Sequence, residues 1–156
     1  MLYIFGKHGQ VGTALEHLLG VEARCFSQGD ADFSHPERLR VFLDTLPVPS
    51  AIINASAYTA VDKCESEEAL ACAINAESPA ILARYCHDHH IPFVHYSTDY
   101  VFPGVGERPY TESDATGPLN AYGRTKLKGE QKVTEVGGDY LIFRTSWVYD
   151  GTGKTS

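Results

Sequence analysis

Short apolar runs alternate along the chain with segments in which apolar residues recur at helical spacing. The apolar runs predict strands at 2–5, 21–26, 51–53, 92–96 and 140–143. The segments between them predict helices at 11–19, 34–46, 65–76 and 78–85, and a last one from about 120 to about 136. Strands and helices in strict alternation are typical of βαβ units and a parallel sheet.

We therefore expect an α/β, Rossmann-like, doubly wound parallel sheet formed by one domain over residues 1–150. Right-handed crossovers would give the strand order 3-2-1-4-5, with a ligand crevice at the carboxyl ends of the strands. Ser34-His35-Pro36-Glu37 has the form of a capping box at the start of the second helix. The fifth strand should carry an exposed apolar strip where it lacks a neighbour.

Composition narrows the class of protein. The chain has 156 residues, of which 43% are hydrophobic and 21% charged, as in one ordinary globular domain. A formal net charge of −7 makes nucleic acid and anionic membrane poor partners. No stretch approaches the ~18 apolar residues of a membrane span, and no secretion signal precedes the first glycines, so a cytoplasmic location is expected. The four cysteines form no CxxC pair and are expected to be reduced thiols.

A glycine-rich turn follows the first strand directly. In Gly6-Lys7-His8-Gly9-Gln10-Val11-Gly12 the glycines would allow a tight turn and a close approach of the backbone to a pyrophosphate. The start of the next helix would add N–H donors and partial positive charge. The spacing is GxxGxxG and not GxGxxG, so a purely structural turn is the alternative interpretation.

The end of the second strand bears on the choice of nicotinamide cofactor. An acidic residue there would favour NAD, but Ser27-Gln28 occupy the position and Arg24 is nearby, which favours NADPH unless Arg24 lies on an exposed strand face. Asp32 and Phe33 are expected to flank the adenine. The alternative for Asp32 is an acid that stabilises the start of a helix.

A tyrosine and a lysine four residues apart share one face of the last helix. Tyr122 could protonate the alkoxide formed when a ketone accepts hydride, if Lys126 lowers its pKa from about 10 toward neutrality. Ser97 and Thr98 end the fourth strand across the crevice, and the hydroxyl of Thr98 would polarise the carbonyl. Taken alone, such a Tyr and Lys are a common surface pair of a helix. Together with the glycine turn and the strand-end hydroxyls, they indicate a reductase.

Five motifs in order carry a more specific resemblance: residues 6–12, 54–65, 96–104, 118–126 and 143–149. Over the whole chain they resemble the dTDP-4-dehydrorhamnose reductases, which are extended short-chain dehydrogenases/reductases. The resemblance implies reduction of dTDP-4-dehydro-L-rhamnose to dTDP-L-rhamnose with NADPH or NADH. The cofactor contacts that it implies are Gln10, Val11, Asp32, Phe33, Ala57, Tyr58, Thr59, Tyr122 and Lys126, to which we add Gly6, Gly9, Gly12 and Tyr96. Sugar contacts are expected from Thr98, Asp99 and Trp147.

Two departures from the family matter. Members run to nearly twice this length, so we expect two further strands and most of the sugar-nucleotide pocket to lie beyond Ser156. Some members bind Mg²⁺ through glutamates at a dimer contact, but Ala14 stands where the first would fall, so we predict no metal site. Residues 151–156 look like a phosphate-binding loop, yet Val148 stands where that motif needs a glycine; a solvated loop, cut short, is expected.

Two other functions compete with the reductase. A non-catalytic dinucleotide-binding regulator, like the β subunit of methionine adenosyltransferase, shares much of the motif set. A related dehydratase or epimerase is disfavoured because Asp99 is followed by Tyr100, where dehydratases of this group have glutamate. The sequence leaves open the choice between NADPH and NADH, and whether the full-length protein is a homodimer.

Overall fold

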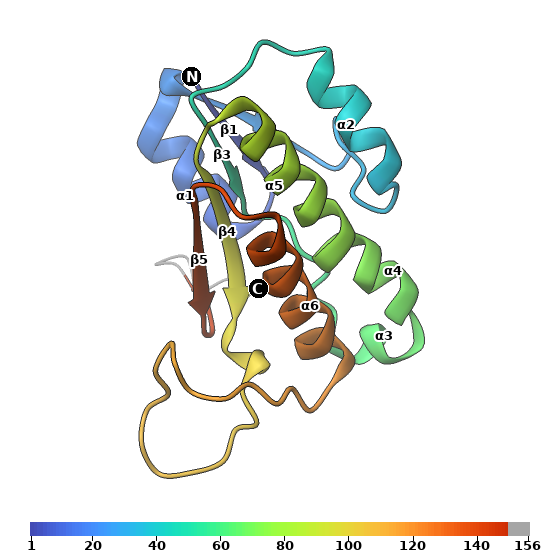
Figure 1. The fold of residues 1–156 in the computed structure, drawn as a ribbon, viewed down its shortest axis with the longest axis vertical. Helices are drawn as coiled ribbons and strands as arrows, with labels where there is room; N and C mark the ends of the chain where they lie inside the picture. The colour runs from blue at the N-terminus through green and yellow to red at the C-terminus, as the bar shows by residue number, and fades with distance from the viewer. Residues whose placement is uncertain (150–156) are drawn as a thin grey trace.

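The computed structural model of the chain describes residues 1–149. Its centre is a five-stranded sheet in which every neighbouring pair of strands is parallel (Figure 1). The strands are β1 (Leu2–Phe5), β2 (Ala23–Phe26), β3 (Ala51–Asn54), β4 (Phe93–Thr98) and β5 (Tyr140–Thr145). The Rossmann-like parallel sheet expected from the sequence is therefore confirmed.

The expected strand order is wrong. The observed order is β2-β1-β3-β4-β5, so β3 lies beside β1 and β2 forms an edge. The residue types explain this arrangement. In β2 the charged side chain of Arg24 is exposed, whereas strands inside a parallel sheet are covered on both faces and are nearly continuously apolar. The uncharged Ala-Ile-Ile run of β3 suits the interior position better.

Helices cover the two faces of the sheet unequally. Figure 1 shows α1 (Gln10–Leu19) on one side and a row made by α2 (Pro36–Asp44), α5 (Ser78–His89) and α6 (Ala121–Val136) on the other. Because β1 connects to β2 in one direction along the sheet and β2 connects to β3 in the other, the crossover helices change face at this point. In open α/β sheets, ligands bind at such a switch point, outside the carboxyl ends of the strands.

The third predicted helix, at 65–76, is more elaborate in the structure. It is divided into α3 (Val61–Ser66), α4 (Glu68–Cys72) and one π-helical turn (Ala73–Glu77) that runs directly into α5. The capping box expected at Ser34 is absent: His35 is the N-cap of α2 and makes no side-chain cap bond. The Ser34 hydroxyl donates instead to Asp32 Oδ1 at 2.7 Å, which fixes the loop before α2.

The core lies between the sheet and the row of helices. Aromatic rings from β1 and β2 form its centre: Phe5 stacks on Phe26 with ring centroids 5.1 Å apart, and Tyr3 meets Phe26 edge-on. On the other face of the sheet, Leu141 and Phe143 of β5 are exposed, which confirms the expected apolar strip.

The remaining expectations about organisation concern the chain's ends and membrane association. Within residues 1–149, no helix combines the length and the apolar character needed to cross a membrane. The loop expected at 151–156 lies outside the described residues, and the domain expected over 1–150 stays a prediction.

Candidate functional site

The glycine turn joins β1 to α1 at the switch point of the sheet. Gly6 has a φ of 98°, a conformation that residues with a Cβ rarely adopt, and a Cβ on it would lie 2.6 Å from the carbonyl oxygen of Ala55. A Cβ on Gly12 would lie 2.1 Å from the oxygen of Gly6. These two glycines therefore let the turn pack closely against β3 and α1. Gly9 is the N-cap of α1, and it has no side chain that could accept a hydrogen bond from the start of the helix. The first N–H groups of α1 therefore point out of the N-terminal end of the helix.

The segment after β3, residues 55–59, lies opposite this turn and is held by two buried asparagines. Asn54 Oδ1 accepts from the backbone N–H of Ser56 at 3.0 Å. Asn75, in the π-helical turn, accepts from Tyr58 N at 2.8 Å and donates to Tyr58 O at 3.2 Å. Each amide has a fixed orientation, because Asn54 Nδ2 lies 3.1 Å from His95 Nδ1 and Asn75 Nδ2 donates to Thr125 Oγ1 at 3.1 Å.

Three of the cavities formed by residues 1–149 lie side by side along this edge of the sheet, and neighbouring cavities share lining residues. The Lys126 cavity, about 200 Å³, lies between the glycine turn and α6. The Phe33 cavity, about 310 Å³, shares Ser56 and Ala57 with it. The Tyr122 cavity, about 150 Å³, shares Thr59 and Tyr122 with it. Together they form an elongated hollow that runs from Phe33 past the start of α1 to Trp147, a shape that fits an extended dinucleotide with a second ligand at one end.

Tyr122 and Thr98 face each other in the Tyr122 cavity. Burial raises the pKa of Tyr122 above its ordinary value of 10.0, and a side-chain hydrogen bond with Thr98 opposes this rise. The sequence led us to expect the opposite direction, with Lys126 lowering this pKa. That expectation is wrong for this structure, because the ammonium of Lys126 donates to the backbone oxygen of Tyr96 at 2.6 Å instead.

Lys126 is the most unusual charged group of the site. Only 1% of its surface is exposed, and burial lowers its pKa to about 8, although the negative charge of Glu130 acts in the other direction. Glu130 is itself engaged by Ser97 Oγ at 2.5 Å and by Arg144 Nη2 at 2.7 Å. This buried ammonium can interact strongly with a ligand that enters the Lys126 cavity, because there is little water to screen its charge.

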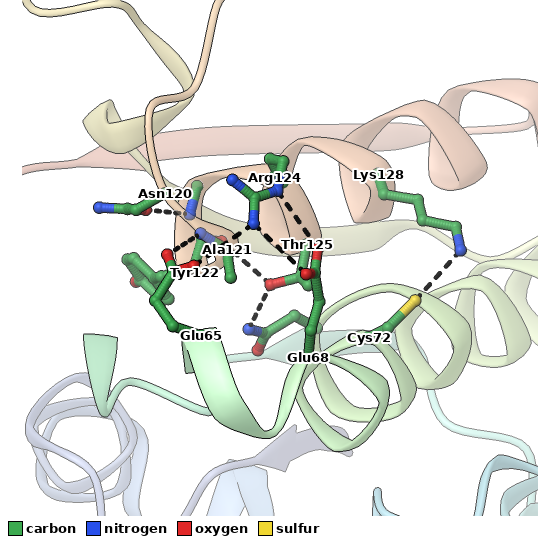
Figure 2. Close-up of polar contacts among 11 residues, drawn as sticks. Glu65, Glu68, Cys72, Asn120, Ala121, Tyr122, Arg124, Thr125 and Lys128 are labelled. Atoms are coloured by element: carbon green, nitrogen blue, oxygen red, sulfur yellow. Dashed lines mark hydrogen bonds and ion pairs between the residues drawn. The ribbon is translucent and has the colours of Figure 1, made fainter. Parts of the chain in front are cut away.

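The helix that carries Tyr122 and Lys126 is fixed at its first turn (Figure 2). Asn120 caps α6 by accepting from Gly123 N at 2.8 Å, and Glu65 Oε1 accepts from Ala121 N at 2.6 Å. Arg124 reaches across to α4 and donates to Glu68 Oε1 at 3.2 Å. The carboxylates of α3 and α4 therefore hold the start of α6 next to the Tyr122 cavity.

Asp32 has a local structural task as well as a place in the Phe33 cavity. Its carboxylate accepts from the backbone N–H and hydroxyl of Ser34, at 2.9 and 2.7 Å, and lies 3.0 Å from His35 Nδ1. These hydrogen bonds, those of Ser34 above all, lower the pKa of Asp32. The structure is therefore compatible with both interpretations made from the sequence. Asp32 lines the Phe33 cavity, where an adenine is expected, and it also stabilises the chain just before α2.

The structure brings together most of the residues that the sequence singled out. All of the predicted site residues except Gly6 and Gly12 line one of the three cavities; those in the Lys126 cavity are Gly9, Gln10, Val11, Ala57, Thr59, Tyr96, Tyr122 and Lys126. The Phe33 cavity has Asp32, Phe33 and Tyr58, and the Tyr122 cavity has Thr98, Asp99 and Trp147, the last 71% exposed. No role was predicted for Asn54, Asn75 or Glu65, although Asn54 and Glu65 bound one of the five motifs. A polar residue inside the apolar Ala-Ile-Asn-Ala run was the available signal for Asn75.

Comparison with known proteins agrees with this geometry. The model of the RmlD substrate binding domain family matches residues 1–156. The chain is 45% identical to the dTDP-4-dehydrorhamnose reductase of Escherichia coli K12, over 98% of this chain and 53% of the relative. The corresponding protein of Burkholderia thailandensis is 44% identical over 98% of this chain and 52% of the relative.

Two solved structures show the same arrangement. A dTDP-4-dehydrorhamnose reductase from Clostridium acetobutylicum superposes with a TM-score of 0.90 at 37% identity, over 96% of this chain and 54% of that one. The Bacillus anthracis enzyme, solved in complex with NADP, gives 0.88 at 35% identity, over 95% and 53%. The chain therefore spans about half the length of the proteins it matches.

Proposed function

The chain belongs to the RmlD substrate binding domain family, and we propose that it is the cofactor-binding, proton-donating half of an NAD(P)H-dependent reductase that converts dTDP-4-dehydro-L-rhamnose to dTDP-L-rhamnose. The observation that carries the proposal is the convergence of Thr98, Tyr122 and Lys126 on two cavities that share Tyr122. Gly9, Gln10 and Val11, at the start of α1, line the cavity that contains Lys126.

The residues of the hollow fit a nicotinamide dinucleotide. The N–H groups and the positive end of the α1 dipole at the start of this helix suit a pyrophosphate, and the Phe33 cavity offers an aromatic ring and backbone for an adenine. Lys126 would contact the nicotinamide ribose at the far end. A bound reduced nicotinamide supplies the hydride. The related enzyme solved with NADP supports this assignment.

Tyr122 is suited to protonate the reduced carbonyl. Since burial raises its pKa, the phenol keeps its proton at neutral pH, which a proton donor must do before the reaction. Proton transfer leaves a buried phenolate, and the ammonium of Lys126, one helical turn away, would stabilise that negative charge. Thr98 would hydrogen-bond the same carbonyl oxygen as negative charge develops on it.

The sugar would occupy the Tyr122 cavity, where Asp99 and Trp147 line the wall next to Thr98. The names of the relatives support a dTDP-linked 4-keto sugar as the substrate. The roles of these residues, a homodimer of the full-length protein and a cytoplasmic location stay predictions.

The test is to replace Tyr122 by phenylalanine in the full-length protein. Turnover should fall at least ~10²-fold, the scale for losing a positioned proton donor, while the dissociation constant for NADPH changes little. Tyr140→Phe is the matched control, because it removes a hydroxyl from β5, away from the three cavities. Turnover is followed by NADPH absorbance with dTDP-4-dehydro-L-rhamnose. Near-normal turnover of Tyr122→Phe would remove this tyrosine from the mechanism, and a wild-type protein that binds NADPH without reducing the sugar would favour the regulatory alternative.

A further inference from the structure

A buried ion pair lies behind the Lys126 cavity. Glu130 of α6 is 6% exposed, and its carboxylate accepts from Arg144 Nε at 3.0 Å and from Arg144 Nη2 at 2.7 Å. The hydroxyl of Ser97 donates to Glu130 Oε1 at 2.5 Å. Because Ser97 also lines the Lys126 cavity, its side chain connects this carboxylate to the space proposed for the cofactor.

Glu130 and Lys126 lie one turn apart on the same face of α6. Residues four apart on a helix are neighbours, and both of these side chains are buried. Two consecutive residues of β4 contact them: Tyr96 O accepts from Lys126 Nζ at 2.6 Å, and Ser97 donates to Glu130. Both charges therefore lie between α6 and β4, where little water screens the attraction between them.

The charges around Lys126 make Glu130 its favourable partner. Burial lowers the pKa of Lys126 to about 8, and the negative charge of Glu130 opposes that shift. His95 of β4 carries no charge at neutral pH, because burial and then Lys126 lower its pKa well below 6.5. Arg144 of β5 is a cation, but its charge is offset by the ion pair with Glu130.

The walls of the cavities add no second carboxylate next to Lys126. The other titratable groups lining the Lys126 cavity, among the residues that the structure describes, are the phenols of Tyr96 and Tyr122. Asp99 lines the Tyr122 cavity instead, and its charge acts on Tyr122. The ammonium therefore depends on a carboxylate behind the cavity and not on one inside it.

We propose that Glu130 is a positioning residue of the reductase site, which acts through Lys126 by keeping the buried ammonium charged although it contacts neither cofactor nor substrate itself. Ser97 and Arg144 hold the carboxylate in place, and Arg144 is itself packed over the ring of Phe102 at 4.9 Å. The inference rests on the proposed function, in which the charge of Lys126 stabilises the phenolate left by proton transfer.

The test separates the charge of Glu130 from its shape. Glu130→Gln keeps the length and an oxygen that can accept from Ser97 but removes the charge, so the pKa of Lys126 should fall by about 1, because an attractive neighbour is lost and Arg144 is left without its partner. Glu130→Asp keeps the charge on a shorter side chain and should recover most of this loss. Glu135→Gln removes an exposed acid from the same helix and is the control that should change nothing.

Two measurements on the full-length protein follow this pKa. NMR of protein labelled with ¹³C at lysine Cε measures it directly, and Lys126→Met identifies the resonance. The pH profile of kcat/KM for the keto sugar follows the same group in the free enzyme. An amine is charged below its pKa, so with a pKa of about 8 in the wild type and about 7 in Glu130→Gln, the variant should be about fivefold less active at pH 8 and nearly equal at pH 6.

A purely structural role would lower kcat/KM by the same factor at both pH values, and that result would overturn the inference. A pKa of Lys126 that is unchanged or raised in Glu130→Gln, or equally low in Glu130→Asp, would do the same. If Glu130→Gln does not fold, Glu130→Asp decides alone: its more distant carboxylate should lower this pKa slightly, and a rise or no change counts against the inference. A wild-type protein that neither binds NADPH nor reduces the sugar would refute the proposed function, whereas the NMR titration would still test the action of Glu130 on Lys126.

Discussion

Replacing Lys126 by methionine should stabilise this protein at neutral pH while removing a residue that the proposed reaction needs. Burial lowers the pKa of Lys126 from 10.5 to about 8. At pH 7 the folded protein therefore holds a charged ammonium in a dry site at a cost of about 3 kcal/mol relative to the unfolded chain. Methionine has a similar length and no charge, so this cost disappears in the variant.

The lost hydrogen bond offsets part of this gain. Lys126 Nζ donates to Tyr96 O at 2.6 Å, and leaving that oxygen without this donor costs about 1–2 kcal/mol. We therefore expect the free energy of unfolding to rise by about 1–2 kcal/mol at pH 7. Between pH 8 and 10.5 the folded protein releases this proton while the unfolded chain still holds it, so the wild type gains stability as the pH rises. The advantage of the variant should then shrink and vanish by about pH 10.

Urea unfolding followed by far-ultraviolet circular dichroism at pH 7 and pH 10 measures both effects. Lys132→Met is the matched control. It removes a lysine from the same helix, but one that is partly exposed and paired with Glu77 at 3.0 Å, so the change in stability should be small and of the opposite sign. A Lys126→Met protein that is less stable than the wild type at pH 7, or whose advantage persists at pH 10, would refute the reasoning.

Two further predictions concern the cysteines and the buried His95. Cys72 should be the first of the four thiols to react with iodoacetamide at neutral pH, because Lys128 Nζ lies 3.1 Å from its sulfur, whereas burial raises the pKa of each of the other three, that of Cys86 to about 12. Peptide mass mapping over time checks this, and faster labelling of any other thiol contradicts it. Burial, and then the charge of Lys126, lowers the pKa of His95 well below 6.5, so acidification below pH 6.5 should destabilise the protein by up to about 1.4 kcal/mol per pH unit as the unfolded chain takes up the proton. In His95→Gln, urea unfolding at pH 7 and pH 5 should show a smaller loss, and an equal loss in both proteins counts against the assignment.

The alternation of strands and helices was readable from the sequence because each strand is a short apolar run between turn residues. The order of the strands could not be read in the same way, because it depends on which strand each one pairs with after the crossover connection. Arg24 in β2 was the usable clue, since a charged strand suits an edge. The π-helical turn at Ala73–Glu77 left no comparable signal in the spacing of apolar residues.

Most site residues were predictable because they follow strands directly or share a helix face, and the carboxyl ends of parallel strands meet at one edge. The directions of their pKa shifts were not predictable from the sequence. Tyr122 and Lys126 do share one face of α6, as their spacing predicts, but the direction of the tyrosine's pKa depends on where the flexible lysine side chain ends. In the folded protein it ends at Tyr96 O, and burial then dominates the pKa of Tyr122.

Two glycines on α6 show how tertiary contacts override local preference in this site. A Cβ on Gly123 would lie 2.3 Å from Tyr100 O, and one on Gly129 would lie 2.1 Å from Asn75 O. Each glycine inside a helix costs roughly 0.5–1 kcal/mol relative to alanine, so helix propensity alone would disfavour both. Gly123 follows Tyr122 directly, and Lys126 lies between the two glycines, so they allow the stretch of α6 that carries both residues to approach the turn after β4 and the π-helical turn closely. Lys126, in the same stretch, is 1% exposed, and this burial lowers its pKa to about 8. The part of α6 that carries the perturbed ammonium of the proposed chemistry is thus also the part in which close packing requires glycines of low helix propensity.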